Sequence, residues 1–290
     1  MAPVWLAFLL SACGHSGRVV TTSQLVGMVR DEPVPDGHVP CAVFDADGTL
    51  WDFDLSETVV DRTVRDRTAS EGGLPALNAM LASFGLPEAG DVYEARASIE
   101  TAWSSGKIAA TGRKRGWDDD AIAERLWPSY SWLYVGFEPS AVAARARVLM
   151  AEQAYRDRVF AGVRPLLAAL RERSYRVRII SGGVHQLVQA AATDLGFQSD
   201  EVRGLALEVR DGVLTDRVVP PVPYQQGKAD LAIKMCGGQP RFVFGDSVAS
   251  GDSAMLDLAA VPVAVRPRDR HLASAVERGM LIWERPDEGE

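Results

Sequence analysis

Two aspartates, Asp45 and Asp47, close an apolar stretch of strand type at residues 41–44. Gly48 and Thr49 follow them directly. At the carboxyl end of a strand in an open α/β sheet, such carboxylates lie at the edge where these sheets bind ligands. Two neighbouring carboxylates are costly unless a cation joins them, and oxygen ligands suit Mg²⁺. Gly48 lets the backbone approach a phosphate closely, and Thr49 offers a hydroxyl and an amide donor. The stretch predicts a magnesium and phosphate site, with a solvated acidic turn as the simpler alternative.

Three further groups of reactive residues follow later in the chain. A serine and two glycines at 181–183 end an apolar run, Lys228 lies near the start of a helical stretch, and Asp246 and Asp252 follow another apolar run. Because the carboxyl ends of parallel strands lie on one edge of a sheet, these side chains can converge with the first two aspartates. Taken alone, Lys228 would be interpreted as an exposed helix lysine.

Strands alternating with helices would position these groups. Segments 176–180, 241–244 and 261–265 have strand character, and Asp211-Gly212 between two further segments is a strong hairpin signal. The alternation predicts a Rossmann-like α/β fold, in which a mostly parallel sheet carries helices on both faces. The expected helices here are 162–173, 184–195, 227–235, 251–260 and 269–277, and the hairpin strands are 201–210 and 213–218.

Residues 53–158 show a different pattern. Apolar residues recur there at intervals of three and four, with Gly and Pro breaks between the segments. This pattern predicts an all-helical insert between the first strand and the rest of the sheet. The expected helices are 55–70, 74–84, 92–104, 118–126 and 139–155.

The composition limits the class of partner. The 290 residues can form one large domain or two, and 31 Lys and Arg face 39 Asp and Glu, for a net charge of −8. The acidic balance argues against a nucleic-acid partner, because phosphate backbones select basic surfaces. It does not exclude a small phosphorylated metabolite, since one cation and one lysine can reverse the field at a site. A monomer and a homodimer both remain open.

The amino terminus resembles an export signal. Residues 4–10 form an apolar run too short to span a bilayer, and Ser11-Ala12-Cys13 resembles the end of a bacterial lipobox. We expect residues 1–13 to be a signal segment, with a lipid on Cys13 anchoring an exported, periplasmic or lipid-anchored protein. No Lys or Arg precedes the apolar run, so a cytoplasmic protein with a buried amino-terminal segment is the alternative. Residues 14–40 are expected to form a linker or an edge element.

Two cysteines and one histidine lie close to the reactive groups. Cys41 and Cys236 are expected to be small buried hydrophobic residues, because they show neither a disulfide framework nor metal-ligand spacing. His185 follows residues 181–183 and is expected on the surface, in the first turn of a helix.

As an ordered set, the motifs resemble the haloacid dehalogenase superfamily, in its phosphoserine-phosphatase-like branch. The resemblance covers residues 41–267. It implies a catalytic core made of residues 41–52 and 159–290, and it implies that the helical insert at 53–158 is a cap over the active site. A cap of this kind would select the substrate and exclude water.

The resemblance also implies a mechanism. Asp45 would attack phosphorus and form an aspartyl-phosphate, because a carboxylate is ionised at neutral pH and needs no base. Asp47 would protonate the leaving oxygen and then take a proton from the hydrolytic water. Lys228 would neutralise the charge of the nucleophile and the phosphate. Ser181 and the Gly182 amide would hold phosphate oxygens at a helix amino terminus.

The resemblance implies that Mg²⁺ is held by Asp45, by the backbone carbonyl of Asp47, and by Asp246. The last motif departs from the family, because five residues separate Asp246 from Asp252 where the family has three or four. Asp252 would be a metal ligand or would hold a metal-bound water. Its alternative role is a capping carboxylate on the following helix.

Substrate selection rests on the insert. Five of the seven tryptophans lie near or within it, and ordinary burial statistics favour core positions for most of them. The sharper hypothesis is that some of them, with Asp52 and Asp54, surround a cationic head group. Asp54 stands where phosphoserine phosphatases carry an acid that meets the substrate's amino group. Phosphoserine, phosphoethanolamine or phosphocholine would fit. The five tryptophans are Trp51, Trp103, Trp117, Trp127 and Trp132.

The expected activity is thus a magnesium-dependent phosphomonoesterase. A phosphotransferase or mutase on the same fold would share every core residue and differ only in the acceptor that replaces water. An exported binding protein with a vestigial phosphatase site is the alternative from another class. The intact Asp45, Asp47, Lys228 and Asp246 argue against it, because a binding protein needs no acid/base aspartate.

Overall fold

The structure is a computed structural model that describes residues 17–33, 39–284 and 286. The expected signal segment 1–13 and the lipid site at Cys13 lie outside these residues. Within the described part, no helix combines the length and the apolar character needed to cross a membrane.

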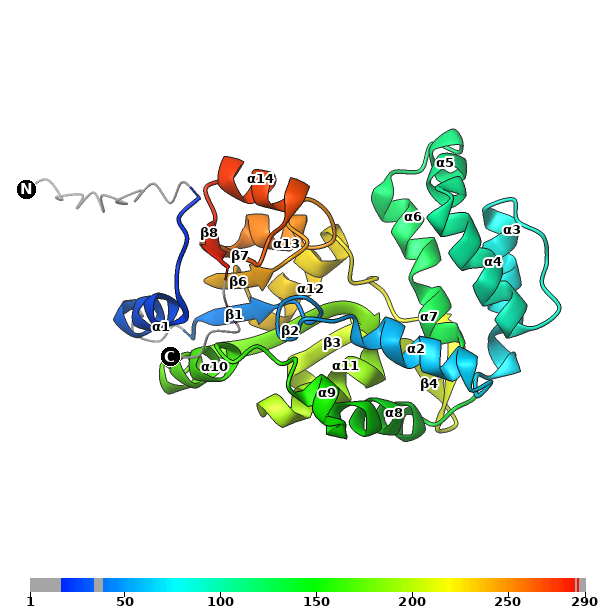
Figure 1. Ribbon diagram of the computed structural model, residues 1–290, viewed down its shortest axis with the longest axis horizontal. Helices are drawn as coiled ribbons and strands as arrows, with labels where there is room; N and C mark the ends of the chain where they lie inside the picture. Colours follow the sequence, from blue (N-terminus) through cyan, green and yellow to red (C-terminus); the bar gives the residue numbers. More distant parts are fainter. Residues whose placement is uncertain (1–16, 34–38, 285, 287–290) are drawn as a thin grey trace, which may run out of the picture.

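A six-stranded parallel sheet forms the centre, and it confirms the predicted α/β architecture (Figure 1). The strand order is β3-β2-β1-β6-β7-β8, so the strand that precedes the two aspartates lies inside the sheet. Phe44, its last residue, is in register with Ile179 on one side and Phe244 on the other. The strands are β1 (Cys41–Phe44), β2 (Arg176–Val184), β3 (Val202–Leu205), β6 (Phe242–Gly245), β7 (Val261–Val265) and β8 (Leu281–Trp283).

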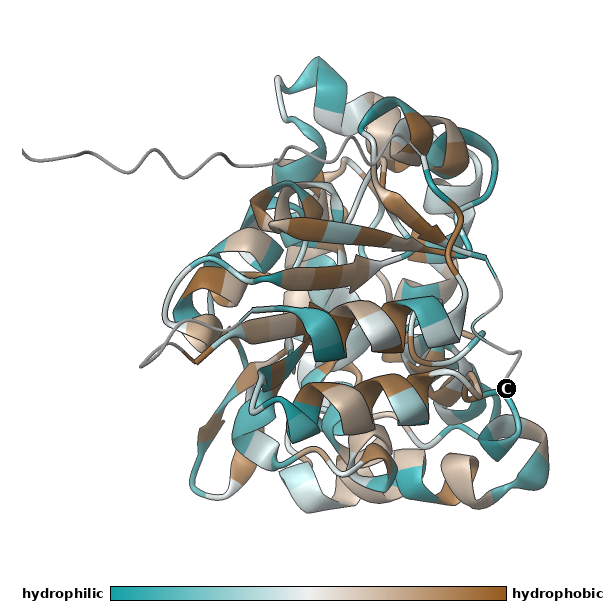
Figure 2. Cartoon of the chain, turned by 90° about the vertical axis from the view of Figure 1, so that its left-hand side faces the viewer, coloured by the Kyte–Doolittle hydropathy of each residue, from teal (hydrophilic) through white to brown (hydrophobic). Residues whose placement is uncertain are grey.

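Alternation along the strands divides the core into two layers, as the prediction of helices on both faces requires. Ala42 and Phe44 pack on one side with α1, α10 and α11, while Cys41 and Val43 pack on the other with α12, α13 and α14. Figure 2 shows the apolar strands between helices whose outer faces are hydrophilic. These helices are α1 (Thr22–Asp31), α10 (Val163–Glu172), α11 (His185–Ala192), α12 (Gln226–Cys236), α13 (Ser253–Leu258) and α14 (Asp269–Glu277).

The helical insert, residues 53–158, is helical as expected, with two short helices that the sequence reading missed, α5 and α7. Helices α3 to α7 lie beyond the end toward which the β1 arrow points, on the right of Figure 1. Helix α8 instead packs against α11 of the core and against α2. The helices are α2 (Leu55–Arg65), α3 (Leu74–Ser83), α4 (Val92–Ser104), α5 (Lys107–Lys114), α6 (Asp119–Leu126), α7 (Pro128–Trp132), α8 (Pro139–Ala151) and α9 (Gln153–Arg156).

The predicted hairpin is present as β4 (Leu207–Arg210) and β5 (Val213–Val218), an antiparallel pair outside the main sheet. The residues before it, which we expected in the same strand, form β3 of the main sheet. The hairpin binds the insert through backbone hydrogen bonds, from Gly136 N–H to the Leu214 carbonyl (2.7 Å) and from Leu214 N–H to the Phe137 carbonyl (2.9 Å). Trp132 Nε1 also donates to the Asp216 carbonyl at 2.8 Å.

We expected residues 14–40 to form a linker or an edge element. The linker is wrong for residues 22–31, which form a helix, whereas Val19 pairs with Ile282 of the edge strand β8. Helix α1 begins with a capping box, in which Thr21 and Gln24 exchange side chain–backbone hydrogen bonds of 3.2 and 2.9 Å. It packs against α10, and Trp283 Nε1 donates to Thr22 Oγ1 at 3.2 Å. The capping box was readable in the sequence.

The expectation for the two cysteines is also wrong. Cys41 and Cys236 form a disulfide, with their Cα atoms 5.6 Å apart. Both side chains are buried, as expected, but topology rather than sequence spacing brings them together. Helix α12 runs back along the sheet, so its last residue lies beside the first residue of β1 although 195 positions separate them.

Candidate active site

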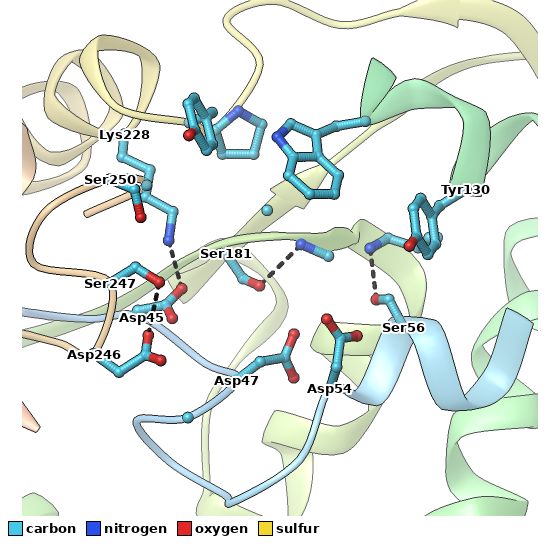
Figure 3. A pocket seen from close by; sticks show the side chains of 18 of the residues that line it. Asp45, Asp47, Asp54, Ser56, Tyr130, Ser181, Lys228, Asp246, Ser247 and Ser250 are labelled. Carbon is cyan, nitrogen blue, oxygen red and sulfur yellow. Dashed lines mark hydrogen bonds and ion pairs between the residues drawn. The ribbon is translucent and has the colours of Figure 1, made fainter. Parts of the chain in front are cut away.

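A cavity of about 540 Å³ lies at the carboxyl edge of the sheet, between the core and the helical insert. Figure 3 shows Asp45, Asp47 and Asp54 along one segment, with Lys228 pointing toward Asp45 from the opposite side. The sequence-predicted groups therefore converge. The predicted residues that line the cavity are Asp45, Asp47, Asp54, Ser181, Gly182, Lys228 and Asp246.

A buried lysine holds two of the aspartates. Lys228, in the first turn of α12, donates from Nζ to Asp45 Oδ1 and to Asp252 Oδ1, both at 2.6 Å. All three side chains are at least nine-tenths buried. Burial lowers the pKa of Lys228, but the charges of Asp252 and Asp45 outweigh burial, so its pKa is raised. Lys228 is thus a fixed ammonium ion, and its interpretation as an exposed helix lysine is excluded.

Three carboxylates crowd this lysine. Oxygens of Asp45, Asp246 and Asp252 lie within 4.8 Å of one another. Burial, with Asp252 next, raises the pKa of Asp45 well above its ordinary value, and the same two causes raise the pKa of Asp246 to about 7. One ammonium cannot balance three carboxylates, so the donor set fits a hard divalent cation such as Mg²⁺.

Within that cluster, Asp252 differs from the other two. Its carboxylate is fully buried, and Oδ1 accepts from Lys228 while Oδ2 accepts from Ser247 N–H at 2.9 Å. Both oxygens therefore already have partners. The lengthened loop after Asp246 still delivers Asp252 to the cluster, and this geometry favours a supporting role over direct ligation.

Asp47 turns away from the cluster. Its Oδ1 accepts from Trp51 Nε1 (2.6 Å) and from Leu55 N–H (3.0 Å), which leaves Oδ2 without a partner among the described residues. Burial, followed by the charge of Asp54, raises the pKa of Asp47 to about 8. At neutral pH the carboxyl group therefore holds a proton, and Oδ2 is the atom that carries it. The role of Trp51 in orienting this acid was missed in the sequence, where it was grouped with the insert tryptophans.

Ser181 ends the straight part of β2 inside the cavity. It is 1% exposed, and its Oγ accepts from Gly183 N–H at 3.0 Å. Ser56 Oγ accepts from Val184 N–H at 2.9 Å, and a Cβ on Gly183 would lie 2.5 Å from that same oxygen. The first turn of α2 thus fixes the last residues of β2, where Ser181 and Gly183 lie. Ser56 is a site residue that sequence reasoning missed.

Of the two residues after Asp47, Gly48 lines the cavity and Thr49 does not. Gly48 has φ +74°, and a Cβ there would lie 2.5 Å from Asp246 Oδ2, so glycine is required for this close approach. Thr49 is fully buried and does not line the cavity. Its hydroxyl is therefore not among the groups that face the cavity.

The wall toward the insert is acidic and aromatic. Asp54 caps α2 by accepting from Glu57 N–H at 2.7 Å, and burial raises its pKa. Asp52, the other acid of the hypothesised cage, pairs with Arg158 at 2.5 Å. Asp54 is therefore the acid available to a ligand there. The aromatic side chains of this wall are Phe53, Trp103, Trp127, Tyr130 and Tyr224.

The tryptophans divide between cavity and core. Trp103 is 49% exposed and lies 6.0 Å from Trp127 between ring centres, and Trp127 lies 6.1 Å from Tyr224. Trp117 packs edge-on against Phe84 at 5.5 Å, away from the cavity. Two of the five, Trp103 and Trp127, are therefore in position to contact a ligand.

His185 lies in the first turn of α11, as expected, but its side chain is half-buried rather than on the surface. Its Nδ1 accepts from Gly204 N–H at 3.2 Å, and burial, followed by the charge of Arg203, lowers its pKa to about 4. The ring joins the start of α11 to β3 as a neutral acceptor. Its role is structural.

Replacing His185 with Asn should make the free energy of unfolding depend less on pH between pH 7 and pH 4. The unfolded histidine binds a proton below about pH 6.5 and the folded one only near pH 4, so folding loses about 3 kcal/mol between pH 7 and pH 4. An Asn carbonyl keeps an acceptor for Gly204 without this titration. Urea unfolding at several pH values measures the difference. Parallel curves for the two proteins would contradict the assignment.

The comparison with known proteins agrees with this site. A family model described as haloacid dehalogenase-like hydrolase matches residues 42–260, which is well over half of the chain. The protein therefore belongs to the haloacid dehalogenase-like hydrolases, and the resemblance read from the motifs is confirmed.

Two of the relatives with similar sequences are phosphoserine phosphatases. The chain is 33% identical over 120 residues to phosphoserine phosphatase SerB2 of Mycobacterium tuberculosis, covering 39% of this chain and 29% of that protein. It is 34% identical over 113 residues to a phosphoserine phosphatase of Streptomyces coelicolor, covering 37% of this chain and 26% of that protein. The chain thus matches less than a third of these relatives' length.

Solved structures share the fold at low identity. A Bordetella pertussis protein of unknown function superposes with a TM-score of 0.60 at 18% identity, covering 84% of this chain and 98% of that one. An Anaerococcus prevotii protein, also functionally unknown, has a TM-score of 0.59 at 16% identity, covering 90% of each chain. These matches concern the fold alone.

Proposed function

We propose that the protein is a magnesium-dependent phosphatase that hydrolyses a small phosphate monoester through an aspartyl-phosphate on Asp45. The observation that carries the proposal is the division of labour between two aspartates two positions apart. Asp45 accepts from the Lys228 ammonium, which lowers its pKa against the stronger effects of burial and Asp252, whereas Asp47 accepts from Trp51 and Leu55 and has a pKa of about 8. Two carboxyl groups in environments this different suit a nucleophile and a general acid.

In the first step, Asp45 attacks phosphorus, and the bond from phosphorus to the leaving oxygen breaks. Asp47 gives its proton to that oxygen, so the alcohol leaves neutral. Lys228 opposes the rise in the pKa of Asp45 that burial and Asp252 cause, and it offsets charge on the transferring group. Ser181 and the Gly182 amide, which line the cavity, would donate to phosphate oxygens. Mg²⁺, held by Asp45, Asp246 and the Asp47 backbone carbonyl, would supply further positive charge for the phosphoryl oxygens.

In the second step, Asp47 is ionised and accepts a proton from water as that water attacks phosphorus. The bond between phosphorus and Asp45 breaks, orthophosphate leaves, and both aspartates regain their starting protonation. An acceptor alcohol in place of water would make the same site a phosphotransferase, and an inert site would make it a binding protein.

The aromatic and acidic wall supports a leaving group that carries a positive charge. Trp103 and Trp127 offer aromatic faces, and Asp54 offers a carboxylate on the same side of the cavity. Aromatic faces with a nearby carboxylate bind amines and quaternary ammonium groups. Phosphoethanolamine, phosphocholine and phosphoserine are the substrates to try first.

We further propose that the protein is exported. The Cys41–Cys236 disulfide supports this location, because disulfides persist in oxidising compartments and are rare in the reducing cytoplasm. Fractionation of cells that express the full chain tests the proposal, and metabolic labelling with a fatty acid tests the lipid on Cys13.

A phosphate-release screen tests the activity. The panel contains the three charged esters, a neutral aryl phosphate and an acceptor alcohol, each with Mg²⁺ and with a chelator. Release that requires the metal supports the phosphatase, and transfer to the alcohol supports the phosphotransferase. If no ester is turned over and beryllium fluoride does not bind, the binding-protein alternative replaces the proposal.

Replacing Asp54 with Asn should raise KM for the charged esters about tenfold, because one charge-assisted contact is lost. The aryl phosphate should change less than threefold. Asp91→Asn is the matched control, since Asp91 also caps a helix by accepting from a glutamate N–H at 2.7 Å and does not line the cavity. Equal losses on charged and neutral esters would show that Asp54 has no part in selecting the leaving group.

A further inference from the structure

A second cavity, of about 410 Å³, adjoins the active-site cavity along Gly48, Asp52 and Asp246. The rest of its wall is Arg266, Arg268 and His271, which follow β7 at the carboxyl edge of the sheet. We propose that this cavity is a second binding site, for a free tetrahedral oxyanion of the orthophosphate type. The mechanism above uses none of its three basic residues.

The arginines facing the cavity are incompletely compensated. Arg266 packs over the Phe160 ring at 5.0 Å and reaches Asp52 only at 3.9 Å, while Asp52 already receives Arg158 Nε at 2.5 Å. Arg268 is exposed, and its side chain forms no hydrogen bond or ion pair with any residue that the structure describes. The remaining acid, Asp246, belongs to the carboxylate cluster beside Lys228. Positive charge therefore faces this cavity without a committed partner.

The histidine adds a neutral donor. His271 Nδ1 accepts from Ala249 N–H at 3.0 Å, so the neutral ring carries its hydrogen on Nε2. His271 lies in the first turn of α14, and Arg268 is the extended residue just before that helix, so the two side chains reach the cavity from neighbouring positions. Two guanidinium groups and one imidazole N–H form a donor set that suits a compact oxyanion, because guanidinium forks match phosphate oxygens.

The wall composition favours a free ion over a second phosphoryl group of the substrate. Every aromatic residue of the proposed leaving-group wall lines the first cavity, and none lines the second. An ester seated with its organic part toward the insert would therefore leave the second cavity to another molecule. The release of orthophosphate beside this cavity rests on the proposed function. The binding of phosphate in the second cavity does not depend on that function.

The backbone of residues 266–269 also indicates a ligand site. Arg266 and Asp269 have φ values of +43° and +48°, a region that non-glycine residues rarely adopt. Such conformations persist where the surroundings hold them, and they gather at ligand sites. Here they turn the chain between β7 and α14 so that Arg266 and Arg268 face the same cavity.

Equilibrium titration of the metal-free protein with inorganic phosphate tests the site without any turnover. Asp246 of the carboxylate cluster lines both cavities, so the part of the phosphate binding that Arg268→Gln removes is the part assigned to the second cavity. Arg268→Gln should weaken it about tenfold, the loss of one charged contact. Arg113→Gln, on the exposed face of α5, should bind as the wild type does. Equal binding by all three proteins, or equal weakening in both variants, would overturn the proposal.

Two kinetic arms separate the sources of phosphate. With an aryl phosphate as substrate, inhibition of the wild type should depend on the square of the phosphate concentration, and inhibition of Arg268→Gln should be linear. If a bisphosphate ester is a better substrate than its monophosphate for the wild type but not for Arg268→Gln, the cavity binds part of the substrate. That result would overturn the free-ion assignment. If titration succeeds and no ester is hydrolysed, the proposed function fails and the oxyanion site stands.

Discussion

Replacing Asp45 with Asn should lower turnover by about 10⁴-fold or more, the loss expected when a nucleophile is removed. An amide of the same shape cannot give a stable acyl-phosphate. Folding should be retained, because Lys228 keeps Asp252 as its partner at 2.6 Å and one of three crowded carboxylates is gone. Phosphate release over a fixed time measures the loss, and thermal unfolding verifies the fold.

Asp230→Asn is the matched control. Asp230 lies on α12, the helix that carries Lys228, and its exposed side chain only accepts from Gln226 at 2.8 Å. It should retain wild-type turnover. Acid quenching during turnover should also leave phosphate on the Asp45 peptide of the wild type and none on the variant. Turnover of Asp45→Asn within tenfold of the wild type would remove Asp45 from the role of nucleophile.

Replacing both Cys41 and Cys236 with Ala should lower the free energy of unfolding by about 4 kcal/mol. The disulfide closes a loop of 195 positions, and long loops gain most from a crosslink in the chain-entropy account. For a chain of this size the melting temperature should fall by about 10 °C. Urea unfolding of the oxidised protein and of the double variant measures the change.

A reducing agent provides the control for that prediction. It should lower the midpoint of the wild type and leave the double variant unchanged, because the variant contains neither buried thiol. A wild-type midpoint that does not respond to reduction, in a protein shown by thiol titration to be reduced, would show that the crosslink contributes little to stability.

The sequence could predict that the catalytic groups converge, because a parallel sheet brings the carboxyl ends of its strands together. Asp45 and Asp246 each follow an apolar strand, Ser181 lies near the end of another, and all such strand ends meet at one edge of a parallel sheet. Lys228 could be placed beside them only through the order of the motifs. Its two partners at 2.6 Å required the three-dimensional structure.

Features that depend on one contact between distant segments could not be predicted. The disulfide depends on where α12 ends relative to β1, and the hydrogen bond that holds the His185 ring comes from β3, 17 or more positions further along the chain. Trp51 orients Asp47 from a turn that no periodicity describes. Strand β8 is three residues long, too short for an apolar pattern to stand out. Helix α1 is the exception, since its capping box was visible and overlooked.

The fastening of the β4–β5 hairpin to the insert has a mechanical consequence. The insert joins the core at a neck where Asp52 N–H donates to the Arg158 carbonyl at 3.1 Å, and again at the hairpin, where Gly136 and Leu214 are bonded at 2.7 Å. Helix α8 of the insert also packs against α11 of the core, so this part of the insert stays with the core. Any widening of the cavity that preserves these contacts must therefore come from the outer helices, α3 to α7, moving relative to α8. Trp132, bonded to the hairpin, limits how far they move while that bond holds.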